Sequence, residues 1–222
     1  MGMIVLDARA RTECLGFPNA YTLLLPERAV KGKRFPLILC LHDLGQDRWQ
    51  CMRKANPEEF VEKSGVAVIL PDGRRSCFLN MAHGPRWNDY LLQGLIGQAC
   101  DTFPLEKGRV GVIGTGTGAL GALMLARRGV SCALVEPEIR DVTDRDEMRW
   151  PREEEWRGVL EGCRADWQAL HWKKIQGTMT GNKIALDRTE TILELFHWKK
   201  ICCENDSGKA WESALTDLAG RI

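Results

Sequence analysis

Short apolar segments alternate with amphipathic ones along the first two thirds of the chain. The apolar segments are rich in β-branched residues and predict β-strands at residues 21–26, 35–42, 66–73, 109–114 and 131–137. The stretches between them have helical spacing and predict helices at residues 56–65, 87–103 and 119–129. Strands that alternate with helices in this way indicate an α/β fold, with a mostly parallel central sheet covered by helices on both faces.

The pattern changes at about residue 141. Residues 141–170 are highly charged and contain several tryptophans, and Pro151 is well placed to open a helix. Beyond them we expect strand, helix, strand and helix in turn, at residues 173–178, 182–196, 199–204 and 209–222. Because no linker or low-complexity segment interrupts the chain, we expect one domain over residues 1–222, with 141–170 as an altered, cap-like segment.

Composition and charge exclude several classes of partner. The chain has 31 Lys and Arg against 30 Asp and Glu, so its net charge of +1 gives no electrostatic reason to expect nucleic acid or a membrane surface as a partner. No apolar run approaches the roughly 18 residues of a membrane span. The nine cysteines include no C-x-x-C pair and no zinc-ligand spacing. We therefore expect reduced thiols, no metal site and a cytoplasmic protein.

A glycine-rich stretch at residues 109–129 carries the first chemical signal. It runs from an apolar strand through alternating glycines into a helix of small residues, RVGVIGTGTGALGALMLARRG. Two overlapping dinucleotide patterns fit this stretch, G-x-G-x-x-A at Gly114, Gly116 and Ala119 or G-x-G-x-x-G at Gly116, Gly118 and Gly121. Glu136 follows near the end of the next predicted strand, where an acid would bind a ribose. An NAD- or FAD-binding oxidoreductase is therefore one hypothesis for this chain, although the residues before the stretch call for no cofactor.

Three ordered segments favour a different family. They are LILCLHDLGQD at 37–47, VILPDGRRSCFLNMAHGPRWNDYL at 68–91 and GVIGTGTGALGAL at 111–123. Together they resemble the oxyanion loop, the V-x-P-[DN]-G-x-x-S-F-Y-T-x-M segment and the G-x-S-x-G nucleophile elbow of the esterase D, S-formylglutathione hydrolase and tributyrin esterase group. The resemblance implies a single α/β-hydrolase domain, an ancestry of carboxylic ester hydrolysis and no cofactor.

The catalytic triad of that group is not intact in this sequence. Gly116 stands at the position of the nucleophilic serine, and a glycine cannot form an acyl-enzyme. The family's acid corresponds to Thr180 and its histidine to Lys209, and no histidine follows His197. The resemblance therefore implies a hydrolase scaffold without serine-esterase activity.

Part of the binding machinery is expected to remain. The backbone N–H groups of Leu44 and Thr117 correspond to the family's oxyanion-hole donors, which need no particular side chain. Asp43 replaces the glycine of the family's H-G pair and is expected to crowd this pocket or repel an anion. Thr115 and Thr117 flank the elbow position and are the candidates for a displaced nucleophile.

Other reactive side chains have more ordinary interpretations. A Cys–His dyad of Cys51, Cys77 or Cys100 with His83 is an alternative to simple burial of the thiols, and His42 is expected to pack at a strand end. The tryptophans of the C-terminal third are expected either to pack against the sheet or to form a binding surface, and they are Trp150, Trp156, Trp167, Trp172 and Trp198.

Three hypotheses for function follow. The first is a non-catalytic protein that binds a small acyl or carboxylate ligand, another copy of itself or an active homologue. The second is a residual carboxylesterase or acyl hydrolase with a displaced nucleophile. The third is the nucleotide-binding oxidoreductase.

Overall fold

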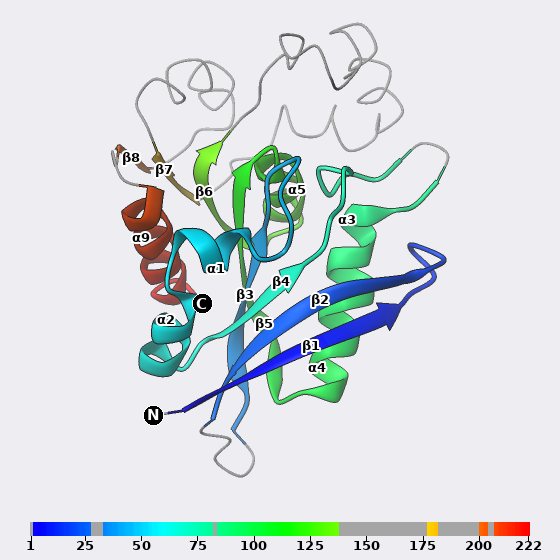
Figure 1. Ribbon diagram of the computed structural model, residues 1–222, viewed down its shortest axis with the longest axis horizontal. Helices are drawn as coiled ribbons and strands as arrows, with labels where there is room; N and C mark the ends of the chain where they lie inside the picture. Colours follow the sequence, from blue (N-terminus) through cyan, green and yellow to red (C-terminus); the bar gives the residue numbers. More distant parts are fainter. Residues whose placement is uncertain (1, 28–32, 82–83, 138–176, 182–199, 204–206) are drawn as a thin grey trace, which may run out of the picture.

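A twisted eight-stranded sheet forms the centre of the computed structural model, which describes residues 2–27, 33–81, 84–137, 177–181, 200–203 and 207–222 (Figure 1). The strands lie in the order β1-β2-β4-β3-β5-β6-β7-β8. β1 pairs antiparallel with β2 and β2 antiparallel with β4, whereas every pairing from β4 to β8 is parallel. The predicted mostly parallel α/β sheet is confirmed.

Apart from β1, each strand overlaps a segment that the sequence predicted. The strands are β1 (Met3–Arg11), β2 (Pro18–Pro26), β3 (Phe35–Leu41), β4 (Ala67–Pro71), β5 (Leu105–Gly116), β6 (Ser131–Pro137), β7 (Gly177–Gly181) and β8 (Lys200–Cys203). β3 and β4 are buried along their whole length, which explains why they appear in the sequence as continuous apolar runs. The strand expected at 173–178 begins instead at Gly177, and residues 173–176 lie outside the described part.

Helices cover both faces of this sheet, as predicted. The helices are α1 (Gln50–Lys54), α2 (Pro57–Ser64), α3 (Trp87–Asp89), the π-helix η1 (Tyr90–Ile96), α4 (Gly97–Thr102), α5 (Gly118–Arg127) and α9 (Ser207–Ala219). One core cluster joins α3, η1, α4 and α5 to the sheet, and a second joins α1, α2 and α9 to its other face. Figure 1 shows these two groups of helices on opposite sides of the strands.

Two elements were absent from the sequence prediction. β1 lies at the edge of the described sheet and exposes Ile4 and Val5, so it lacks the continuous apolar pattern of a buried strand. α1 has only five residues, too few for a helical periodicity to be recognised. The helix expected over 87–103 is present but changes its winding in the π-helical segment η1.

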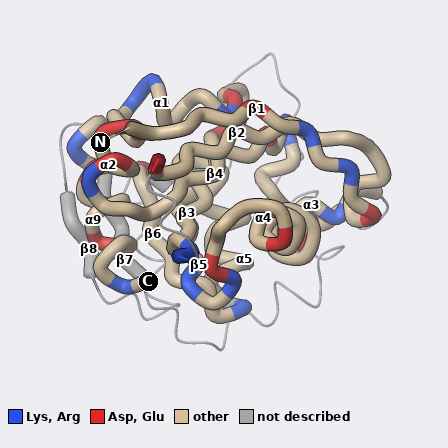
Figure 2. The backbone as a smooth tube through the Cα atoms, turned by 90° about the horizontal axis from the view of Figure 1, so that it is seen from below, with Lys and Arg blue, Asp and Glu red and all other residues tan. Residues whose placement is uncertain are grey.

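Charge and apolar length add two further observations. Acidic and basic residues are interspersed along the described backbone in the view of Figure 2. Among the described helices, none is both long enough and apolar enough to span a membrane. The altered segment at 141–170 and the helix expected at 182–196 lie outside the described residues.

Candidate functional site

A sharp turn joins β5 to α5 at the place where the sequence predicted a nucleophile elbow. β5 ends at Gly116 and α5 begins at Gly118, so Thr117 alone separates strand from helix. Gly116 has a φ of +52°, in the left-handed region that residues with a Cβ adopt only at a cost. The local geometry is therefore the strained strand–turn–helix connection that exposes a nucleophile in α/β-hydrolases.

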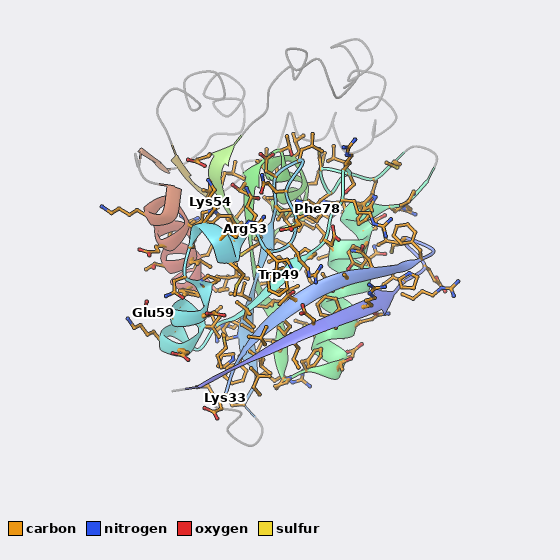
Figure 3. The ribbon with its side chains drawn as sticks, viewed as in Figure 1. Lys33, Trp49, Arg53, Lys54, Glu59 and Phe78 are labelled. Carbon is orange, nitrogen blue, oxygen red and sulfur yellow. The ribbon has the colours of Figure 1, made fainter. Side chains whose placement is uncertain are left out.

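The glycines around the turn are explained by close packing. An ideal Cβ at Gly118 would lie 2.6 Å from the backbone oxygen of His42 and 2.7 Å from that of Leu41. At Gly121 it would lie 2.5 Å from the Cβ of Phe78, a side chain that Figure 3 shows beside α5. These glycines let α5 approach β3 and the segment after β4, so the dinucleotide pattern needs no nucleotide to account for it.

The carboxylate of Asp43 lies in this turn. Asp43 belongs to the loop between β3 and α1, and its Oδ1 accepts hydrogen bonds from the backbone N–H of Thr117 at 2.8 Å and of Leu44 at 2.7 Å. The hydroxyl of Thr117 donates a third hydrogen bond to the same oxygen, at 2.9 Å. The two backbone donors are those that the sequence matched to an oxyanion hole. One oxygen of Asp43 therefore occupies the point on which they converge.

The same carboxylate fills the space beside Gly116. An ideal Cβ at Gly116 would lie 2.2 Å from the Cγ of Asp43 and 2.3 Å from its Oδ1. No real Cβ tolerates so short a contact, so Asp43 in this position and a side chain at residue 116 exclude one another. The absence of a side chain at Gly116 is what gives Asp43 room to reach the turn.

The backbone of the loop is held separately from this carboxylate. The N–H of Asp43 donates to Oε1 of Gln50 at 2.7 Å, and Nδ1 of His42 lies 2.7 Å from the carbonyl oxygen of Asp43. The N–H of Leu44 also donates to Oγ1 of Thr117, at 2.9 Å. The loop therefore keeps anchors that do not involve the Asp43 side chain.

His42 is buried and fixed in one neutral tautomer. Because a carbonyl oxygen only accepts, Nδ1 of His42 donates to Asp43, and Nε2 accepts the N–H of Gly73 at 2.8 Å. Burial lowers the pKa of His42, although its hydrogen bond to the Asp43 carbonyl and the nearby carboxylate of Asp72 act in the opposite direction. The ring also packs edge-on against Phe78. This histidine has the packing role that the sequence predicted.

The three cysteines that the sequence offered as nucleophiles are buried. Burial raises the pKa of Cys77 to about 12, although a side-chain hydrogen bond with Thr117 acts in the opposite direction. Burial also raises the pKa of Cys100. Cys51 is buried and forms a hydrogen bond with Cys40, whose pKa burial raises well above its usual range. Neither Cys77 nor Cys100 is activated as a thiolate nucleophile.

The segment that follows β4 has a strained backbone, and the side-chain amide of Asn88 ties this segment to α5. Cys77 and Phe78 have φ angles of +50° and +57°, which are unusual for residues with a side chain. The side-chain amide of Asn88 donates to the carbonyl of Phe78 at 3.3 Å and to that of Gly121 at 3.1 Å, tying this segment to α5. Nothing in the sequence singled out Asn88 or Gln50, because their partners are distant in the chain or are backbone atoms.

The structure brings some of the predicted site residues together and leaves others apart. Asp43, Leu44, Gly116 and Thr117 form one cluster, and Thr115 is buried beside it in β5. Thr180 lies in β7, where it pairs with Val135 of β6. Lys209 is exposed in the first turn of α9, and Glu136 lies near the end of β6 with a φ of +44°.

Three of the four histidines fall outside the described part of the chain. They are His83, His171 and His197, and with them the proposed Cys–His dyad lies outside it. The tryptophans at residues 150–198 lie there too. His42 is the one histidine in the part of the chain that the structure describes, and both of its ring nitrogens already have hydrogen-bond partners.

Comparison with solved structures identifies the fold. The S-formylglutathione hydrolase of Staphylococcus aureus matches with a TM-score of 0.76 at 19% identity, over 99% of this chain and 100% of that one. The fluorophosphonate-binding serine hydrolase F of the same organism matches with a TM-score of 0.75 at 17% identity, over 99% of both chains. The S-formylglutathione hydrolase of Agrobacterium tumefaciens gives 0.74 at 15% identity, over 99% of this chain and 93% of that one.

Sequence comparison gives no such relative. No protein-family model matches the chain, and no curated protein matches it. The structural neighbours are esterase-type α/β-hydrolases, and at these identities they establish the α/β-hydrolase fold.

Proposed function

We propose that this α/β-hydrolase-fold chain derives from the esterase D and S-formylglutathione hydrolase group, has lost serine-esterase activity, and serves as a binding protein on the inherited scaffold. One observation carries the proposal. The position of the nucleophile holds Gly116, and the space where a nucleophile's side chain would begin holds the carboxylate of Asp43. The missing hydroxyl at Gly116 and the carboxylate that fills the space beside it both argue against an acyl-enzyme at this position.

Two steps of serine-esterase catalysis are affected. Gly116 offers no hydroxyl to attack an ester, so no acyl-enzyme forms at the elbow. The N–H groups of Leu44 and Thr117 already donate to Asp43, so they are not free to stabilise the oxyanion of a tetrahedral intermediate. Either loss alone costs an esterase most of its rate, and here both fall on one small cluster.

The proposed role is binding, with a small acyl or carboxylate compound as the ligand. The donors at the turn suit an oxygen that carries negative charge, because backbone N–H groups at the start of a helix favour anions. Association with a second copy or with an active homologue is the other role we expect of the scaffold. Thr180 and Lys209, at the positions of the acid and the histidine, complete the proposed loss of the triad.

The proposal is tested by reaction with a fluorophosphonate probe and by hydrolysis of p-nitrophenyl acetate and butyrate. The S-formylglutathione hydrolase of Staphylococcus aureus serves as the positive control at equal concentration. We expect no labelling of this chain and no hydrolysis above that of a heat-denatured sample. Stoichiometric labelling, or hydrolysis that saturates with substrate, would overturn the proposal.

A residual hydrolase is the second candidate, and one contact favours it. The hydroxyl of Thr117 donates to the Asp43 carboxylate at 2.9 Å, which is the arrangement of a nucleophile and a base. Against it, the same hydroxyl accepts the N–H of Leu44, and Thr117 is 3% exposed. If the unmodified chain hydrolyses esters, the variants Thr117→Val and Thr115→Val test which of the two hydroxyls is the nucleophile. Loss of activity in the first variant alone would assign the reaction to Thr117.

A further inference from the structure

The Asp43 carboxylate is bound as a ligand would be bound. Its Oδ1 accepts three hydrogen bonds from two separate parts of the chain, the loop after β3 and the start of α5. All three lengths lie between 2.7 and 2.9 Å, the range of hydrogen bonds to a charged acceptor. The donors of this cluster come from two parts of the chain and converge on one carboxylate oxygen.

We propose that this cluster is a carboxylate-binding site that the protein closes with its own Asp43, and that its external ligand is a small monocarboxylate which competes with that side chain. The inference rests on the proposed function, because an active esterase would need the same donors for its oxyanion. It makes Asp43 an autoinhibitory residue. The ligand gains access only when the Asp43 side chain rotates out of the site.

The shape of the site supports a small planar acid. Both the Cγ and the Oδ2 of Asp43 lie within 2.6 Å of the point where a Cβ at Gly116 would be, so the carboxyl group lies against a bare backbone. The donors converge on one oxygen, and the space left by Gly116 takes the rest of the group. A free carboxylate can accept the same hydrogen bonds once the Asp43 side chain has left the site.

The anchoring of the loop supports exchange. Gln50 holds the N–H of Asp43 and His42 holds its carbonyl, so the backbone keeps its place when the carboxylate leaves. Asp43 is partly exposed. Rotation of its side chain out of the site is therefore the movement that the proposal requires.

The experiment is a rescue of Asp43→Ala by acetate. Thermal unfolding is measured with sodium acetate and with sodium chloride at equal ionic strength, for the wild-type chain, Asp43→Ala, Asp43→Asn and Asp47→Ala. Asp47 is the matched control, since it is an acid of the same loop whose carboxylate pairs with Arg53 at 2.8 Å, outside the site. Inorganic phosphate is a third arm, because it is an anion of different shape.

We expect Asp43→Ala to unfold several degrees below the wild type in chloride. Acetate should then raise its Tm with a saturating dependence, and phosphate should raise it less. The wild type and Asp47→Ala should need much more acetate for the same rise in Tm, because acetate must first displace Asp43, and so should Asp43→Asn, whose amide oxygen fills the site. Adding Thr117→Val to Asp43→Ala removes the donating hydroxyl and should weaken the acetate response.

Two results would overturn the inference. One is an Asp43→Ala variant whose Tm rises no further in acetate than in chloride. The other is an equal acetate response in Asp47→Ala. Should Asp43→Ala fail to fold in chloride, its refolding in acetate but not in chloride is the same test. The proposed function fails separately, through labelling or hydrolysis by the unmodified chain, whether or not acetate binds.

Discussion

The Cγ of Asp43 lies 2.2 Å from the point where a side chain at Gly116 would begin. The two residues therefore depend on each other, since Asp43 can reach the donors at the turn only while residue 116 has no side chain. This relationship also changes how an attempt to restore the esterase must be designed. Replacing Gly116 by serine alone places the new side chain on top of a carboxylate, so Asp43 must be replaced as well.

The first prediction is that Gly116→Ala is destabilising and that Asp43→Ala partly relieves it. The φ of +52° costs a residue with a Cβ about 1–2 kcal/mol. Displacing the carboxylate from its donors adds about 1–3 kcal/mol. In the Asp43→Ala background only the backbone cost remains. Urea unfolding of both single variants and the double variant gives the coupling energy. Additive effects would contradict the contact.

The second prediction concerns two glycines with opposite surroundings. A Cβ at Gly118 meets backbone oxygens of β3 and of the residue after it, which cannot turn aside, so Gly118→Ala should cost at least about 2 kcal/mol. Gly97 begins α4 and has nothing within 4 Å of its ideal Cβ. Gly97→Ala should therefore stabilise the protein by up to about 1 kcal/mol. Equal effects in chemical denaturation would refute the packing explanation of the glycine-rich turn.

The fold could be predicted where burial determines the sequence. β3, β4 and β6 are covered on both faces and show continuous apolar runs, whereas the edge strand β1 exposes Ile4 and Val5 and shows no such run. At the site, the motif order was enough to place Gly116 at a strand–helix turn. The sequence could not show that Asp43 reaches Thr117, 74 residues away, because that contact depends on how two loops meet in space.

The third prediction concerns Asp89, a buried carboxylate that ties α3 to the end of α5. Its Oδ1 lies 2.7 Å from a guanidinium nitrogen of Arg128, and Arg86 pairs with its other oxygen. Burial by itself would raise the pKa of Asp89, but the hydrogen bonds from Arg128 and Asn80, together with the charges of Arg128 and Arg86, lower it overall. Asp89→Asn should cost about 3 kcal/mol, because the partly buried guanidinium of Arg128 then faces a neutral amide in place of a carboxylate.

The control for Asp89 is a surface pair of the same kind. Lys107 and Asp101 lie 2.7 Å apart, and both side chains are more than 60% exposed. Asp101→Asn should cost less than about 1 kcal/mol in the same denaturant titration. The folded-state pKa of Asp89 is lower than its pKa in the unfolded chain. The stability that Asp89 contributes is therefore present above the unfolded-state pKa and is lost as the pH falls through the folded-state pKa. Equal costs for the two variants would show that the buried pair has no special role.

The fourth prediction is a pH dependence that His42 introduces. Its Nε2 accepts the N–H of Gly73, so the neutral ring is the one that fits, and protonation would break this bond. The carboxylate of Asp72, 3.8 Å from the same nitrogen, is too distant to offset the burial that lowers the pKa of His42. Below the unfolded value of about 6.5 the unfolded chain therefore binds a proton that the folded chain does not.

Stability should consequently fall as the pH drops below about 6.5, by up to about 1.4 kcal/mol per pH unit from this group, until the pH reaches the folded-state pKa. His42→Gln keeps an acceptor in place of Nε2 but cannot titrate, so its stability should fall less steeply between pH 7 and pH 5. The comparison uses the difference in slope, because every other titratable group is the same in both proteins. Parallel curves for the two proteins would mean that His42 is protonated as readily in the folded state as in the unfolded one. The Gly73 hydrogen bond would then not fix its tautomer.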